Sequence, residues 1–335
     1  MNTATFNTML AALEHLTDQQ IRCVERVLKG ESPEKQVIHA IQQRMVEKPE
    51  CPYCHGDQIK RHGKMGSMQR YRCKSCSKTF NATTKTPMSG LHHKGKWFDY
   101  FACMIEGKTL RESAKACGID LKTSWRWRHR FLEAPALLKA LSLQGIVEAD
   151  ETLFPYSEKG NKNLNRAAKK RGSKAKKPGR SKEDWVPVLT IRDRSGQTCD
   201  AVISSVGAAQ LNAEFKDKIE PDSVLCSDGL RSYVRVASEN KLIHKQLNIS
   251  AGVRIIDTVF HIQNVNAYHS RLKTWMRRFH GVASKYLEHY LGWFRFLETN
   301  KNPNKNNLFA IQQQILTTQP CFYHPYDVSC FPLTA

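Results

Sequence analysis

The chain has 335 residues, with 52 Lys or Arg against 31 Asp or Glu, and its formal net charge is +21. This length exceeds one ordinary hydrophobic core, so two or three domains are expected. The charge favours a polyanionic partner such as nucleic acid. Because no stretch of about 18 apolar residues and no signal-peptide pattern occurs, the sequence predicts no membrane partner and a cytoplasmic location.

Residues 1–47 are predicted to form short helices, since apolar side chains recur at helical spacing on both sides of Thr17. A helical stripe of this kind usually packs against other helices. We therefore interpret this region as a packing or dimerisation element rather than as a separate DNA-binding unit.

A zinc ribbon is predicted over residues 48–84. Two C-x-x-C pairs occur there at ribbon spacing, and they consist of Cys51, Cys54, Cys73 and Cys76. Four thiolates complete the tetrahedral shell of Zn²⁺ and leave no open position, so the metal would be structural. A disulfide scaffold is the alternative reading of eleven cysteines, but such scaffolds are short chains. His55 and His62 are expected on the surface.

A helix-turn-helix is predicted within residues 85–140. Thr109 and Glu112 have the spacing of a capping box, in which each side chain satisfies a free amide at a helix start. The turn falls at Gly118, and a second helix begins near Leu121. That helix carries basic side chains that are expected to contact DNA, namely Arg126, Arg128 and Arg130. A basic helical hairpin with only a packing role is the alternative.

Residues 143–300 are expected to form an α/β domain in which strand-like runs come first and helices follow. The expected strands are Ile146–Phe154, Trp185–Asp193, Thr198–Val206 and Ser223–Ser227. The expected helical regions are Leu211–Ile219 and His261–Thr299. Residues 159–182 contain eleven Lys or Arg and no acid, and we interpret them as a basic loop on the DNA backbone, with a merely solvated loop as the alternative.

Two aspartates, Asp150 and Asp228, each end a strand-like run. Carboxylates on adjacent strands can hold two Mg²⁺ or Mn²⁺ ions, which prefer oxygen ligands and activate water for attack on a phosphodiester. Taken alone, solvated acids at strand ends are the more common reading of such a pair. Glu148 shares the strand face of Asp150 and Glu151 takes the opposite face, and a supporting or surface role is expected for both.

Four short runs in the second half of the chain carry a family resemblance. VEADET occupies residues 147–152, HIQNVNAYHSRLKTW residues 261–275, RRFHGV residues 277–282 and KYL residues 285–287. Together with the cysteine pairs, these runs resemble transposases of the insertion-sequence family numbered fifteen ninety-five, called ISXO-two-like. The resemblance extends over about residues 48–297.

This resemblance implies a ribonuclease-H-like catalytic domain, in which a mixed sheet is flanked by helices. It also implies an active site of Asp, Asp and Asn followed by Lys, which falls here on Asp150, Asp228, Asn266 and Lys273. The first three of these would hold catalytic Mg²⁺ or Mn²⁺. The implied partners are double-stranded DNA, as the inverted-repeat ends of the element and as target DNA, and further copies of the chain in a homodimer or larger synaptic complex at the nucleoid.

On a helix, Asn266, His269 and Lys273 lie on one face, so all three can approach one scissile phosphate. Lys273 is expected to bind DNA phosphate, and His269 to orient a phosphate or a metal-bound water. Asn266 is a weaker metal ligand than the Glu common at this position in related transposases, which leaves Asp257 and Glu288 as alternatives. Further DNA-backbone contacts are expected from Arg271, Arg277 and Arg278.

These features predict a DNA transposase that cleaves the ends of its insertion sequence and joins the freed 3′ hydroxyl to target DNA. The alternatives are a non-catalytic DNA-binding regulator derived from a transposase and a structure-selective nuclease on the same fold. The complete set of Asp150, Asp228, Asn266 and Lys273 favours the enzyme. Residues 301–335 form a tail whose Cys321, His324 and Cys330 are spaced too irregularly for a metal site.

Overall fold

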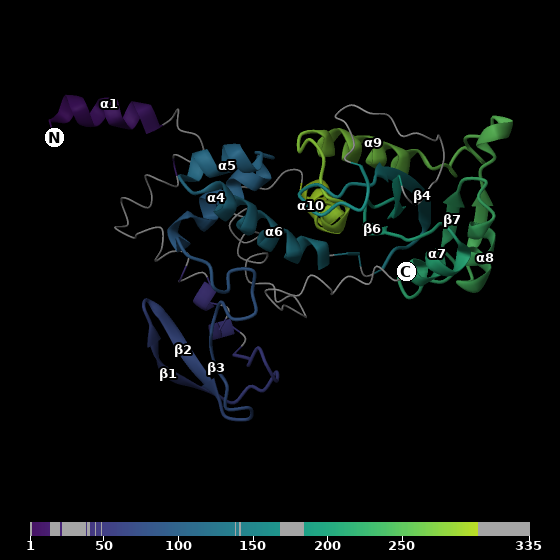
Figure 1. Cartoon of the computed structure of the whole chain (residues 1–335). Coiled ribbons are helices and arrows are strands. Elements are labelled where there is room, and N and C mark those ends of the chain that lie inside the picture. The colour runs from purple at the N-terminus through teal and green to yellow at the C-terminus, as the bar shows by residue number, and fades with distance from the viewer. Residues whose placement is uncertain are drawn as a thin grey trace. The chain divides into compact units, whose positions relative to one another are not determined.

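The computed structural model describes residues 2–13, 49–137, 139–140, 142–167 and 184–300, with scattered positions between 21 and 47. It divides into two units, one of Met1–Ala134 with Asn302–Ala335 and the other of Pro135–Lys301. Helix α1 (Thr3–Leu13) belongs to the first unit (Figure 1). Among the helices described, none is long and apolar enough to cross a membrane.

Three sequence predictions fall largely outside the described residues. They are the helices expected between residues 14 and 47, the greater part of the basic loop (168–182) and the tail (301–335).

The cysteine-rich region of the first unit contains a small antiparallel sheet. Its strands, in the order β1-β2-β3, are β1 (Ile59–Met65), β2 (Met68–Cys73) and β3 (Thr79–Asn81). A two-residue loop joins β1 to β2, and in it Gly66 has a φ of +59°, a left-handed conformation that glycine adopts without strain. Tyr71 and Phe80 stack across β2 and β3 with their ring centroids 5.8 Å apart. One cysteine pair, Cys51 and Cys54, therefore lies before β1, and the other, Cys73 and Cys76, starts at the last residue of β2.

Residues 94–137 are mainly helical, as the sequence predicted. They comprise the 3-10 turn η1 (Lys94–Lys96), α4 (Trp97–Ile105), α5 (Leu110–Cys117) and α6 (Leu121–Leu137), which extends into the second unit. The capping box is confirmed, because the Thr109 amide donates to Glu112 Oε2 at 2.7 Å and the Glu112 amide donates to Thr109 Oγ1 at 3.4 Å. Gly118, with a φ of 56°, ends α5 where the turn was expected. Buried Tyr100 and Trp127 pack edge to face and hold α4 against α6.

A five-stranded mixed sheet forms the centre of the second unit. Its strands are β4 (Ile146–Pro155), β5 (Trp185–Asp193), β6 (Thr198–Val202), β7 (Val224–Ser227) and β8 (Ile243–Gln246), and they lie in the order β6-β5-β4-β7-β8. The first three are mutually antiparallel, whereas β7 and β8 run parallel to β4. This strand order and these directions are those of the ribonuclease-H-like fold, so the predicted fold class is confirmed.

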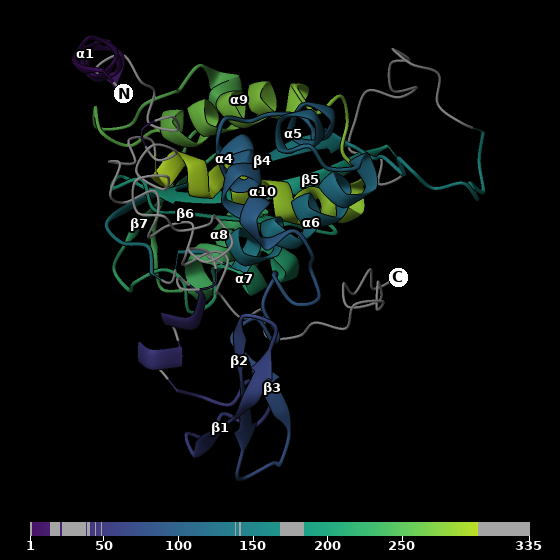
Figure 2. The same cartoon turned by 90° about the vertical axis from the view of Figure 1, so that its left-hand side faces the viewer.

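Helices cover both faces of this sheet (Figures 1 and 2). They are α7 (Ala208–Phe215) and α8 (Ser232–Glu239) on one face, and α9 (Gln263–Arg277) and α10 (Leu287–Thr299) on the other, with 3-10 turns η2 (Ile249–Ala251) and η3 (Ser284–Tyr286). Val147 and Ala149 of β4 pack into the core beneath α7 and α8. Because side chains alternate along a strand, Glu148 and Asp150 point to the α9 face.

A buried polar cluster joins α9 and α10 to the edge strand β6. Asp200 of β6 is 1% exposed, accepts a hydrogen bond from Tyr268 Oη of α9 at 2.6 Å and forms an ion pair with Arg295 of α10. Because breaking such a pair leaves a buried charge without compensation, this cluster fixes both helices on the sheet.

Several predicted boundaries differ from the structure. The expected strand Thr198–Val206 ends at Val202, and the expected helix Leu211–Ile219 is α7, which begins at Ala208 and ends at Phe215. The expected helical region His261–Thr299 is interrupted after α9, where His280 and Gly281 both have positive φ. Strand β8 and helix α8 were not predicted, since the sequence of β8, IHKQ, is short and largely polar and exposes both of its ends.

Gly292 lies where α10 meets the last turn of α6. A Cβ atom at this position would come within 2.6 Å of the Ala136 backbone nitrogen, and backbone cannot move aside as a flexible side chain can. We expect Gly292→Ala to lower the free energy of unfolding by about 2 kcal/mol, despite the ~1 kcal/mol that Ala gains over Gly in a helix. Urea unfolding followed by circular dichroism measures this change.

The matched control is Gly207→Ala, because the nearest atom to a Cβ there is 3.6 Å away and φ is −72°. That variant is expected to lose less than about 1 kcal/mol. Equal stability of Gly292→Ala and the wild type would contradict the close approach of α10 to α6.

Candidate functional site

The register of β4 and β7 brings the two predicted aspartates together. Ala149 and Ser227 are partners in the parallel pairing, and the residues that follow them are Asp150, in the middle of β4, and Asp228, directly after the end of β7. The expectation that Asp150 ends a strand is wrong, because β4 continues to Pro155 in its pairing with β5. Neighbouring strands lie about 4.8 Å apart, so the two aspartate backbones are adjacent. Cys226 of β7 packs on the α9 face of the sheet, and the alternation of side chains assigns Asp228 to that same face.

Tyr233 lies close to both aspartates from the other side of the sheet. Burial raises the pKa of its hydroxyl well above the usual value, and the carboxylates of Glu151, Asp150 and Asp228 raise that pKa further. The hydroxyl therefore stays protonated and donates to Glu151 Oε1 at 2.7 Å. Asp228 in turn accepts from the amide of Leu230 at 3.0 Å, which fixes the turn that follows β7.

Glu148 anchors the start of α9 to β4. Its side chain is fully buried, and its carboxylate accepts from the Val265 amide at 2.9 Å and from Asn264 Nδ2 at 3.0 Å. Arg194 and His261 approach the same carboxylate at 3.2 and 3.3 Å. The carboxylate thus occupies the amino-terminal end of the helix, where free amides and the helix dipole favour negative charge.

From sequence, only a supporting or surface role was expected for Glu148, and no role was expected for Arg194 or His261. The signal for Glu148 was its position two residues before Asp150, on the same face of the strand. His261 opens the run of residues 261–275, but no pattern gave it or Arg194 a role, because both reach Glu148 from segments that are distant in the sequence.

His269 of α9 lies close to Asp150 of β4. Its Nδ1 is 3.7 Å from Asp150 Oδ2, and its side chain is only 8% exposed. Burial, with a contribution from the charge of Lys273, lowers the pKa of His269 to about 4, so the ring is neutral near pH 7. Its Nε2 is buried and has no hydrogen-bond partner among the described residues. This nitrogen is therefore available to a ligand that enters the site.

Asn266 and Lys273 are exposed on the flank of α9 beside His269. They lie three residues before and four residues after it, which places all three on one face of the helix. The alternative acids are elsewhere. Glu288 accepts from the Val202 amide of β6 at 2.9 Å and pairs with Lys139, two strands away from Asp150. Asp257 is 63% exposed and pairs with a lysine of β8.

The arginines that were predicted to contact DNA differ in how exposed they are. Arg126, Arg277 and Arg278 are exposed, and Arg130 is half-buried. Arg271 is 42% exposed and forms a two-pronged pair with Glu298 of α10.

The prediction for Arg128 is wrong. This residue is only 3% exposed, and its guanidinium donates to the Lys108 carbonyl at 2.7 Å and to Ser113 Oγ at 3.2 Å. Arg128 lies three residues before buried Phe131, so helical spacing turns it toward the core rather than toward solvent. Arg128 therefore stabilises the helical region instead of contacting DNA.

The four predicted zinc ligands come together in the first unit. The sulfur atoms of Cys51, Cys54, Cys73 and Cys76 all lie within 4.8 Å of one another, the arrangement that a tetrahedral metal ion requires. The amide of Cys76 lowers the pKa of the Cys73 thiol to about 6, while hydrogen bonds with the neighbouring thiols raise the pKa of Cys54 to about 12. His55 is exposed and pairs with Glu50, and His62 is also exposed, as expected of surface residues.

Zinc analysis tests this cluster directly. We expect the purified chain to hold one Zn²⁺, and Cys51→Ser or Cys76→Ser to lose the metal and to unfold residues 49–81, because a small module of this kind depends on its ion. Atomic emission spectroscopy and limited proteolysis measure the two effects. Lys74→Ala, which changes an exposed side chain between two ligands, should keep the full metal content. Zinc far below one ion per chain in the wild type would refute the site.

Comparisons with known proteins place the second unit in a family. Residues 142–299 match the family model described as ISXO2-like transposase domain. An uncharacterized protein in the transposable element ISH50 of Halobacterium salinarum is 25% identical over 273 residues, which cover 79% of this chain and 91% of that relative. The crystal structure of a pre-cleavage Mos1 transpososome matches at 12% identity and a TM-score of 0.20, over 64% of this chain and 78% of that chain, and this similarity is too low to carry weight. Residues 142–299 therefore belong to the ISXO2-like transposase family.

Proposed function

We propose that this chain is a DNA transposase that binds the ends of its insertion sequence, cleaves them by metal-assisted hydrolysis and joins the freed 3′ hydroxyl to target DNA. The pairing of Ala149 with Ser227 carries the proposal, because it sets Asp150 and Asp228 side by side under α9. An acid pair on adjacent strands suits phosphoryl transfer.

The donor atoms of the site fit a hard divalent ion. Asp150 and Asp228 offer carboxylate oxygens and Asn266 offers an amide oxygen, and oxygen ligands are what Mg²⁺ and Mn²⁺ prefer. When bound, such ions supply an activated water and neutralise charge on the phosphoryl group. The buried Nε2 of His269, which lacks a partner among the described residues, supports a polar ligand in the same place.

The remaining residues of the site position DNA. Lys273 binds a phosphate oxygen as a point charge, while neutral His269 orients a phosphate oxygen or a water next to Asp150. Water attacks the phosphodiester at the element end, which leaves a 5′ phosphate on one side of the cut and releases a 3′ hydroxyl on the other. That hydroxyl attacks a phosphodiester of target DNA in a second in-line transfer and displaces a 3′ hydroxyl of the target strand. Neither step needs a covalent bond to the protein.

The rest of the chain supplies DNA recognition. We assign residues 1–47 to packing or dimerisation, the zinc ribbon (48–84) and the helices within 85–140 to the element ends, and residues 143–300 to catalysis. Arg126 and Arg130 would contact DNA from α6, while Arg277 and Arg278 would contact it from the end of α9. Two ends must react in one event, so a homodimer or larger assembly is required.

Removing either carboxylate tests the reaction. Asp150→Asn and Asp228→Asn are expected to lower the rate of cleavage of element-end DNA at least about 100-fold, because each removes a charged ligand of the metal. Binding of the same DNA, measured by fluorescence anisotropy, should stay within about twofold. A variant that still cleaves at the wild-type rate would refute the assignment, and a wild type without any cleavage would favour the non-catalytic regulator.

The matched control is Asp222→Asn, which changes an exposed aspartate before the opposite end of β7 and should leave cleavage unchanged. The same assay identifies the third ligand. Asn266→Ala should impair cleavage strongly, whereas Glu288→Gln should retain it, since Glu288 bonds to β6. The reverse result would transfer the role of third ligand to Glu288.

A further inference from the structure

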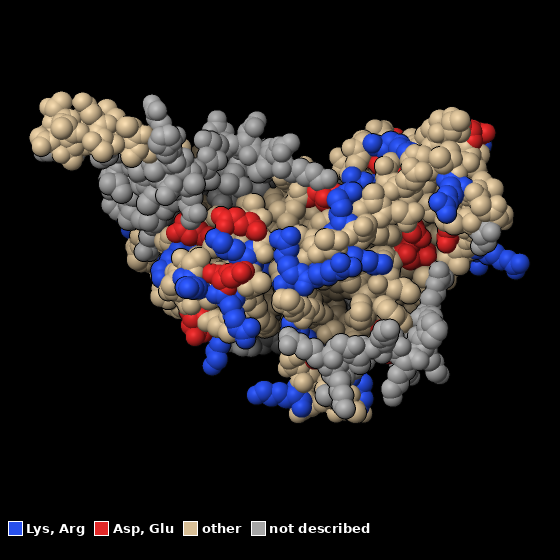
Figure 3. All heavy atoms as spheres, turned by 90° about the horizontal axis from the view of Figure 1, so that it is seen from above, with Lys and Arg blue, Asp and Glu red and all other residues tan. Residues whose placement is uncertain are grey.

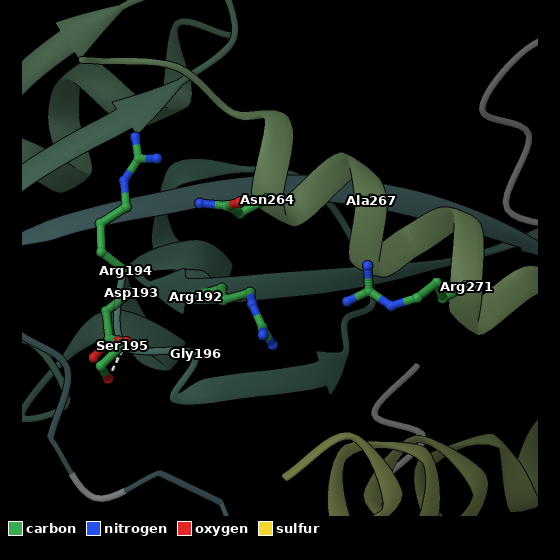
Figure 4. Close-up of a pocket in the computed structure, with 8 residues that line it drawn as sticks. All are labelled: Arg192, Asp193, Arg194, Ser195, Gly196, Asn264, Ala267 and Arg271. Carbon is green, nitrogen blue, oxygen red and sulfur yellow. Dashed lines mark hydrogen bonds between the residues drawn. The ribbon is translucent and has the colours of Figure 1, made fainter. Parts of the chain in front are cut away.

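A basic pocket lies on the flank of α9 that faces away from Asn266 and Lys273. Its volume is about 210 Å³, and it is bounded by the β5–β6 hairpin on one side and by Asn264, Ala267 and Arg271 on the other (Figure 4). Because Asn264 and Arg271 each precede a proposed site residue by two positions, they point about 200° around the helix from that residue. The pocket is thus separate from the surface that carries Asn266 and Lys273.

Three arginines line this pocket, and they differ in how their charge is balanced. Arg194 pairs with Glu148 at 3.2 Å, and Arg271 pairs with Glu298. Arg192 has no carboxylate within ion-pair distance among the described residues. The one acid that lines the pocket, Asp193, is 2% exposed and accepts from Ser195 Oγ and from the Gln197 amide. Arg192 is therefore the arginine of this pocket that no carboxylate pairs with among the described residues.

The guanidinium of Arg192 is held in place before any ligand arrives. It lies over the ring of Tyr268, 5.4 Å from the centroid, and donates to Thr198 Oγ1. A Cβ atom at Gly196 would come within 3.2 Å of Arg192 Nη2, so glycine leaves room for the guanidinium beside the hairpin. A planar fork of donors fixed in this way suits the oxygen atoms of a phosphate.

The pocket also adjoins the anchor of α9. Arg192 is the cross-strand partner of Glu148 in the β4–β5 pairing, and both Arg194 and Asn264 contact the Glu148 carboxylate. DNA that reaches Asp150 on one side of α9 therefore has backbone within reach of Arg192 on the other side, since the helix is only about 10–12 Å across.

We propose that this pocket binds a second backbone phosphate of the DNA, distinct from the phosphate that is cut, with Arg192 as its principal contact. Seen from above, a group of adjoining Lys and Arg side chains lies near the middle of the face (Figure 3), and basic groups of this kind attract a nucleic-acid backbone. This proposal rests on the proposed function in so far as DNA is the ligand.

The test is the salt dependence of DNA binding by the full chain. The probe is a short fluorescein-labelled duplex of arbitrary sequence, titrated without divalent ions between about 50 and 200 mM salt. Arg192→Gln should weaken binding about tenfold and lower the slope of log affinity against log salt by about 0.9, the value for one lost phosphate contact. The affinity of Arg192→Lys for DNA should lie between those of the wild type and Arg192→Gln.

A second variant keeps the test independent of the packing of Arg192. Ala267→Glu adds an acid at an exposed position of the pocket and should weaken binding to a similar extent, whereas the neutral Ala267→Gln should bind nearly as the wild type does. Arg235→Gln, on the opposite face of the sheet, is the charge-matched control and should have little effect.

Wild-type affinity and salt slope in both Arg192→Gln and Ala267→Glu would overturn the proposal. An equal loss in Arg235→Gln would also overturn it, because the effect would then come from net charge alone. This experiment measures DNA binding and not cleavage, so its outcome is independent of the catalytic assignment. If the catalytic assignment fails, Asp150→Asn still cleaves DNA, while Arg192→Gln still weakens DNA binding.

Discussion

A buried carboxylate, that of Glu148, ties α9 to the strand that carries Asp150. Burying a charge costs several kcal/mol unless hydrogen bonds and an opposite charge offset that cost. Here the Val265 amide, Asn264 and Arg194 provide both. Because Glu148 and Asp150 are two residues apart on one face of β4, the contact that places the helix also sets its distance from the aspartate.

The rest of α9 is fixed by contacts of other kinds. In its middle, Tyr268 donates to buried Asp200 of β6, which also pairs with Arg295 of α10. Beyond its end, Lys159 Nζ donates to the carbonyls of His280 and Gly281 at 3.1 and 2.7 Å. A helix held along its whole length can present Asn266, His269 and Lys273 to one phosphate with little reorganisation, which is the condition for electrostatic catalysis.

The parts of the structure that could be predicted from sequence were those with local causes. The capping box of Thr109 and Glu112 and the turn at Gly118 depend on neighbouring residues, and the structure contains both. The spacing of the cysteine pairs likewise predicted the gathering of four thiols. Asp228 directly follows β7, as the sequence indicated, whereas Asp150 lies in the middle of β4 rather than at a strand end. The adjacency of the two aspartates requires the β4–β7 register, which only the folded sheet provides.

Other features depend on partners far along the chain and were missed. The sequence around Arg128 is basic and aromatic, as in a recognition helix, yet Arg128 is buried against Ser113 and the Lys108 carbonyl. Strand β8 is short and polar, and only its pairing with β7 makes it a strand. No sequence pattern marked Arg192 or Arg194 as functional residues, because their surroundings arise only when α9 packs on β4 and β5.

Hydrogen–deuterium exchange of α9 in Glu148→Gln tests most directly whether this buried contact positions the helix. The amide of Val265 loses a charged acceptor in this variant, and the pair with Arg194 is lost with it. We expect faster exchange over residues 263–269 than in the wild type, with exchange in β5 unchanged. Identical protection of these amides in the two proteins would mean that α9 is held in place without Glu148, and the account would be wrong.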